Sequence, residues 1–183
     1  ELRNRLLIEE RLNLRDWLTL DLEGRIEGLL SDRTEENNEV LVKIDEACLK
    51  FYFPHTEVKI GYSKVFWGKL DKLSLIDVVN PLDISKLFME EEIKEAKLAI
   101  PIFMVSPYWG DESQFDFIFI PFFEKGTYDE LNEQSSPFNI INFPWPVEEE
   151  LPSESLENSE YGGRFSSTFR EIDWSFYYFR GFQ

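Results

Sequence analysis

Charged and apolar side chains alternate along residues 2–14 and 17–30, and this alternation carries most of the chemistry that the sequence offers. Successive side chains of a β-strand point to opposite faces of a sheet, so each stretch has one apolar face and one charged face. Helical spacing would instead scatter the leucines around a cylinder. Because both signs of charge share one face, we expect cross-strand ion pairs there. The charged positions are Arg3, Arg5, Glu9, Arg11, Asp21, Glu23, Arg25 and Glu27.

The same alternation continues over residues 40–53 and 57–67. Lys43 and Asp45 oppose a row of branched apolar residues, and Lys59 is flanked by Val58 and Ile60. The alternation slips near Glu46, which predicts a β-bulge. If the charged face lines a pore, rings of charge on it would tune which solutes pass. Together with the residues above, Lys43, Asp45 and Lys59 complete the set that we expect to line a pore.

A second group of polar residues lies in the segment 68–95. Asn80 followed by Pro81 is typical of a helix start, and apolar residues at helical spacing predict a short helix that runs to about Met89. A helix with an apolar face must pack against something, so we expect this loop to fold inward and constrict a pore. The residues expected at this constriction are Asp71, Asp77, Asn80 and Asp83. Their spacing is not that of an EF-hand, and we expect no metal site and no cofactor.

Charge and composition exclude several classes of function. The chain has 183 residues and a formal charge of −17, which excludes a nucleic-acid binder. Three segments, 31–39, 68–95 and 124–160, carry −3, −3 and −9, so the acidity belongs to expected loops. One cysteine, Cys48, excludes an internal disulfide, and one histidine, His55, excludes a histidine metal cluster. No nucleophile elbow, P-loop or dinucleotide fingerprint is present, and we expect no enzyme activity.

The patterned stretches that position these residues number about eight and run for roughly 9 to 14 residues each. Besides those above, they are residues 96–105, 114–123, 161–169 and 173–183. Globular strands are usually shorter, whereas tilted strands of about 9–11 residues span a bilayer. Short links alternate with the long acidic loops, as in outer-membrane barrels. Aromatic residues near the strand ends fit interfacial girdles, and they include Trp17, Trp67, Tyr108 and Trp174. The pattern therefore predicts an all-β fold, an antiparallel up-and-down transmembrane β-barrel formed by residues 1–183 as a single domain or as the N-terminal portion of a larger barrel.

Several short motifs carry a family resemblance that covers most of the chain. They are Ile60-Gly61-Tyr62, Trp67-Gly68, Asp77-Val78-Val79-Asn80-Pro81-Leu82-Asp83, Glu95-Ala96-Lys97, Tyr161-Gly162-Gly163-Arg164 and Asp173-Trp174. In these motifs the chain resembles a family of Gram-negative outer-membrane barrels, porin-like proteins of mostly unknown substrate that are similar to alginate-export and other large porin barrels. The resemblance implies a channel or transport barrel with more than eight strands. It identifies no substrate.

The favoured hypothesis is thus a porin-like barrel in the outer membrane of a Gram-negative bacterium that passes small solutes. Its expected partners are outer-membrane lipid, lipopolysaccharide and other outer-membrane subunits. Two alternatives stay open. One is a structural or interaction barrel whose acidic loops bind a partner. The other is a secreted β-sandwich that binds carbohydrate through Trp109 and Trp145.

Overall fold

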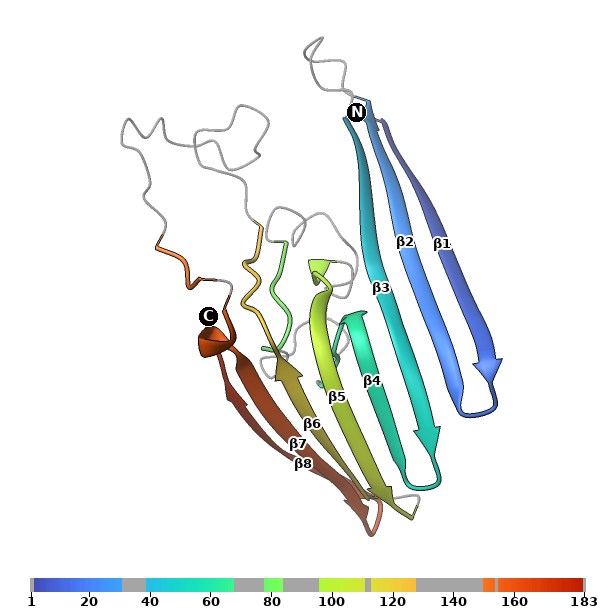
Figure 1. Ribbon diagram of the computed structural model, residues 1–183, viewed down its shortest axis with the longest axis vertical. Helices are drawn as coiled ribbons and strands as arrows, with labels where there is room; N and C mark the ends of the chain where they lie inside the picture. The colour runs from blue at the N-terminus through green and yellow to red at the C-terminus, as the bar shows by residue number, and fades with distance from the viewer. Residues whose placement is uncertain are drawn as a thin grey trace.

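The computed structural model describes residues 2–30, 39–67, 78–83, 96–110, 113–127, 150–153 and 155–182. Within these ranges the chain forms one antiparallel sheet in which each strand pairs with the next along the sequence (Figure 1). The eight strands are β1 (Leu2–Arg15), β2 (Leu18–Leu30), β3 (Glu39–Phe53), β4 (Thr56–Ser63), β5 (Ile100–Trp109), β6 (Ser113–Ile120), β7 (Glu160–Phe169) and β8 (Ile172–Arg180).

The prediction of an all-β, antiparallel up-and-down fold with eight strands is confirmed. Strands β1 and β8 form the two edges, so over the described residues the sheet is open. The described helical structure includes one 3-10 turn, Leu156–Asn158. No helix in the part of the chain that the structure describes is long and apolar enough to cross a membrane.

Three strand ends differ from the sequence-based expectation. Strand β4 ends at Ser63, because residues 64–67 leave the sheet and turn onto one of its faces. Strand β5 begins at Ile100 rather than at Ala96 and continues through Pro107 to Trp109. Strand β6 ends at Ile120, directly before Pro121, which cannot donate a hydrogen bond to a sheet.

One face of the sheet, here called the outer face, is mostly apolar and largely exposed, although Glu10 of β1 and Arg180 of β8 also lie on it. The register places its side chains in rows, such as Leu20 beside Leu49, Ile60 and Phe103. All described strands belong to one sheet, and no second sheet covers this face over the described residues. Its exposed large side chains include Leu6, Ile8, Leu12, Leu22, Ile26, Val42, Ile44, Ile60, Phe103, Phe117, Trp174, Phe176 and Tyr178.

The three junctions between hairpins have the same stagger. Leu18 at the start of β2 pairs with Phe51, so β3 continues past β2 through Tyr52 and Phe53. Likewise Thr56 pairs with Pro107, and β5 continues by two further residues. Ser113 pairs with Ser167, and β7 also continues by two. From β1–β2 to β7–β8, each short turn is therefore displaced in the same direction along the strands (Figure 1). Such a stagger accompanies the strand tilt that closure into a barrel requires.

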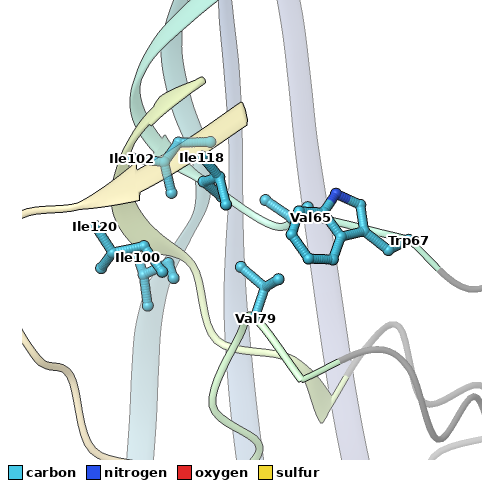
Figure 2. Close-up of a cluster of buried hydrophobic side chains, with 7 residues drawn as sticks. All are labelled: Val65, Trp67, Val79, Ile100, Ile102, Ile118 and Ile120. Carbon is cyan, nitrogen blue, oxygen red and sulfur yellow. The ribbon is translucent and has the colours of Figure 1, made fainter. Parts of the chain in front are cut away.

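The opposite face, here called the inner face, carries the charged side chains on β1–β4 and an apolar cluster on β5–β8. An inner segment, defined as residues 64–67, 78–83 and 96–99, packs on this cluster. Figure 2 shows Val65, Trp67 and Val79 of the inner segment against four isoleucines of β5 and β6. Trp67 was expected near a strand end among the interfacial aromatics, but it is 2% exposed and belongs to this core.

The prediction that a helix starts at Asn80-Pro81 is wrong. Leu82 forms an antiparallel bridge with Lys97, and Asp83 a parallel bridge with Thr127, so the chain is extended here. The side chain of Asn80, expected as a helix cap, binds backbone groups of neighbouring extended segments instead. The remainder of the expected helix, residues 84–89, lies outside the described residues.

Candidate functional site

Ion pairs connect β1, β2 and β3 on the inner face near the short turns. Arg11 lies opposite Asp21 in the register, and its Nε and Nη2 donate to the two carboxylate oxygens at 2.8 and 3.0 Å. Lys50 of β3 donates to Asp21 Oδ2 at 2.6 Å. The buried Asp21 therefore holds two cations, one from each neighbouring strand, which stabilises its charge on the inner face.

A second buried carboxylate, Asp45, lies at the bulge of β3. The register shifts here between Glu23 and Gly24, so Asp45 has no direct partner on β2 and the predicted bulge is confirmed. Arg25 Nη2 donates to Asp45 Oδ1 at 2.8 Å, and Lys64 of the inner segment binds the same oxygen. Asp45 and Arg25 are 3% and 5% exposed, so this ion pair is removed from solvent.

The third carboxylate is Glu46, which also faces inward because the bulge reverses the alternation of β3. Glu46 forms an ion pair with Lys59 of β4 and accepts a hydrogen bond from Ser63 Oγ at 2.9 Å. Cys48 Sγ lies 3.3 Å from the same carboxylate, and the thiol is buried. The inner face of β1–β4 therefore carries two groups of ion pairs, one around Asp21 and Glu46 and the other around Asp45.

The remaining residues expected to line a pore lie on the same two hairpins. Glu9 is exposed and pairs with Glu23 in the register, so the expected opposite-charge pairing does not occur at this level. Lys43 is partly exposed and reaches the inner segment. The backbone register pairs Arg5 with Glu27 and Arg3 with Leu29. The side chains of Arg3, Arg5 and Glu27 lie outside the described part.

Asn80 holds the three pieces of the inner segment together. Its Oδ1 accepts the backbone N–H of Val65 at 2.7 Å, and its Nδ2 donates to the carbonyls of Ser63 and Leu98 at 3.1 and 2.8 Å. Lys97, which is also buried, donates to the Val65 carbonyl at 2.8 Å and lies over the Phe66 ring at 4.4 Å. The chain leaves the sheet after Ser63, and its backbone polar groups there thus find hydrogen-bond partners inside the protein.

One ion pair connects the inner segment to the charged side of the inner face. Lys43 Nζ on β3 lies 2.9 Å from Asp83 Oδ2. Of the four residues expected at a constriction, the structure therefore places Asn80 and Asp83 together on the inner face. Asp71 and Asp77 lie outside the described residues.

A further inner-face ion pair, between Asp116 of β6 and Arg164 of β7, is absent from the sequence-based set. Arg164 Nε donates to Asp116 Oδ2 at 2.7 Å. Arg164 Nη1 and the hydroxyl of Tyr177 donate to the Trp67 carbonyl at 3.4 and 3.1 Å. These contacts hold the inner segment on β7 and β8. The alternation of Asp116 with Phe115 and Phe117 is a signal that could have identified this inward carboxylate.

Glu46, Lys50 and Lys64 are also missing from the predicted set. Glu46 and Lys50 share a face with Lys43 only because the bulge reverses the alternation, so counting every second residue from Lys43 excludes them. Following the reversal after Glu46 would have included both. Lys64 was expected inside a strand, and its contact with Asp45 depends on the chain leaving the sheet at Ser63.

The carboxylates with the lowest exposure on β2 and β3 each bind cations, and the described residues contain no cluster of His, Cys, Asp or Glu suited to a metal ion. No family model, curated protein or solved structure matches the chain.

Proposed function

We propose that the chain forms the wall of an outer-membrane β-barrel that passes or binds small solutes, as its porin-like motifs imply. The observation that carries the proposal is the division of one sheet into an apolar outer face, exposed over the described residues, and a charged, ion-paired inner face. A soluble sheet buries its apolar face against a second layer. In a membrane barrel the apolar face meets lipid and the polar face meets water, and the division of this sheet into an apolar and a charged face supports that assignment.

Strand length and stagger support the same proposal. β1, β2 and β3 have 14, 13 and 15 residues, and a tilted strand of about 9–11 residues crosses a bilayer. The constant two-residue step between hairpins tilts the strands, as barrel closure requires. Lipid cannot satisfy the backbone groups of an open edge, so β1 and β8 must be paired in the membrane.

The space that the inner segment occupies indicates a barrel with more than these eight strands. An eight-stranded barrel has an interior just wide enough for side chains to fill. Here the inner face supports, in addition to its own side chains, the backbone of residues 64–67, 78–83 and 96–99. Further strands would provide that room, and the inner segment would then narrow the lumen on the β5–β8 side. Solutes would pass along the charged wall of β1–β4.

Detergent electrophoresis and planar-bilayer recording test the proposal together. A folded barrel keeps its backbone hydrogen bonds within the wall, so the unheated protein should migrate differently from the boiled protein. After insertion into a planar bilayer it should conduct ions. A protein that dissolves without detergent and shows no heat-dependent migration would contradict the barrel. Heat-dependent migration without conductance would favour the structural or interaction barrel.

A further inference from the structure

The inner face contains a polar pocket beside the short turn between β1 and β2, here called the turn-end pocket. Its lining residues lie at the ends of β1, β2 and β3. Figure 1 shows these strand ends at the end of the sheet where the short turns lie. Its polar lining residues are Arg11, Asn13, Arg15, Asp16, Thr19 and Tyr52. Only one of these side chains is an acid, although the chain as a whole has a charge of −17.

Hydrogen-bond donors dominate this pocket. Arg11 binds Asp21 through Nε and Nη2, so its Nη1 is not used in this ion pair. The Arg11 side chain is 65% exposed. Arg15 makes no ion pair with any residue that the structure describes. The single negative charge of Asp21 does not neutralise Arg11 fully, because Lys50 binds the same carboxylate. Three cations, Arg11, Arg15 and Lys50, therefore lie in or beside the pocket against two carboxylates, Asp16 and Asp21, and this excess of positive charge attracts anions.

Two hydroxyl groups add to the donors. Thr19 is buried, and its Oγ1 lies 3.5 Å from the Tyr52 hydroxyl. Hydroxyl hydrogen bonds are usually about 2.7–2.8 Å long, so this contact is weak and both groups keep capacity for another partner. The Asn13 amide can supply further N–H groups. Guanidinium, amide and hydroxyl donors around one pocket match the oxygens of a carboxylate or phosphate group.

We propose that the turn-end pocket binds a small oxyanion, a carboxylate or a phosphate group, through Arg11 and Arg15, with Thr19 and Tyr52 as secondary donors. The proposal does not depend on bilayer insertion, because the pocket is formed by one hairpin and its neighbouring strand. If the barrel is correct, the site lies at the mouth on the short-turn side. There it would hold an anionic solute next to the charged wall.

The test is titration of the full folded chain in detergent with inorganic phosphate and, separately, with acetate, at constant ionic strength. Chemical shifts of backbone amides around the pocket report binding. Arg15→Gln should weaken binding of the preferred anion about tenfold, since it removes a charge-assisted hydrogen bond without disturbing Asp21. Arg11→Gln should weaken binding at least as much, and Tyr52→Phe by less.

Arg170→Gln is the matched control, because Arg170 is an exposed arginine in the β7–β8 turn at the same end of the sheet. It should leave the affinity unchanged. Tighter binding of phosphate than of acetate would assign the ligand to phosphate compounds, and the reverse order to carboxylates. The proposal is overturned if neither anion shifts the pocket amides, if Arg15→Gln binds like the unaltered protein, or if Arg170→Gln weakens binding equally.

Discussion

Replacing Asp45 with alanine is expected to destabilise the folded protein by about 3–5 kcal/mol, the usual cost of breaking a buried ion pair. The substitution leaves Arg25, which is 5% exposed, and Lys64 beside an apolar methyl group. Neither cation can regain full hydration without opening the contact between the inner segment and the sheet. The free energy of unfolding, measured by denaturant titration in detergent micelles or vesicles, reports the loss.

Glu9→Ala is the matched control for Asp45→Ala, since Glu9 is an exposed carboxylate on the same inner face. Surface substitutions of this kind usually change stability by no more than about 0.5 kcal/mol. A double variant, Arg25→Met with Asp45→Leu, should recover part of the loss because it removes both members of the buried pair. Equal stability of Asp45→Ala and Glu9→Ala would show that the inner face is not desolvated at Asp45.

Gly61→Ala is expected to cost about 3 kcal/mol or more, because both backbone conformation and space oppose a side chain there. Gly61 has φ +135°, a region that residues with a Cβ rarely adopt. A Cβ would lie 2.3 Å from the Ala47 carbonyl oxygen and 2.8 Å from Cys48 Cα on β3. The strands would have to separate at the level where Lys59 and Glu46 form their ion pair.

The control for Gly61→Ala is Gly28→Ala on β2, where a Cβ would have no atom within 4 Å. Alanine at a position whose backbone conformation it can adopt usually stabilises by about 0.4–1 kcal/mol. Unfolding of both variants should be followed by the same denaturant titration. If Gly61→Ala is as stable as Gly28→Ala, the close approach of β3 and β4 described here does not exist.

The strands were predictable because period-two alternation is a local property of the sequence. The apolar positions of 2–14 and 17–30 identified both faces of the first hairpin, and the register shows that these residues do lie on one face. The slip near Glu46 identified the bulge. Pairing within each hairpin was also predictable, since a short link brings its two strands together.

The inner segment was not predictable, because its conformation depends on contacts between residues distant in sequence. Asn80 followed by Pro81 has the local signature of a helix start, but three backbone groups at Ser63, Val65 and Leu98 compete for the Asn80 side chain. These tertiary hydrogen bonds outweigh the local preference. Ala96 and Lys97 were assigned to a strand because no local signal marks where the chain joins β5.

The inner-face network was predictable only in part for the same reason. Arg11 and Asp21 face each other across a short hairpin, so their pairing follows from the turn. Arg25 pairs with Asp45, which depends on the register between β2 and β3 across a long connection. Arg164 and Asp116 lie 48 residues apart, and nothing local indicates that they meet.

The central claim is that the outer face meets hydrocarbon while the inner face stays hydrated, and two adjacent leucines of β1 test it most directly. Leu6 lies on the outer face opposite Ile26, and Leu7 lies on the inner face opposite Arg25. Their exposures in the isolated sheet are similar, 56% and 47%. A protein surrounded by water on both faces would tolerate arginine equally at the two positions.

The decisive measurement is the free energy of unfolding of Leu6→Arg and Leu7→Arg in lipid vesicles. Arginine on a lipid-facing strand position costs about 2–4 kcal/mol near the middle of a bilayer, so Leu6→Arg should be destabilised by that amount. Leu7→Arg should stay within about 1 kcal/mol of the unaltered protein, because Glu9 and Glu23 lie near it on a wet surface. Equal effects of the two substitutions would contradict the claim that one face of this sheet contacts lipid.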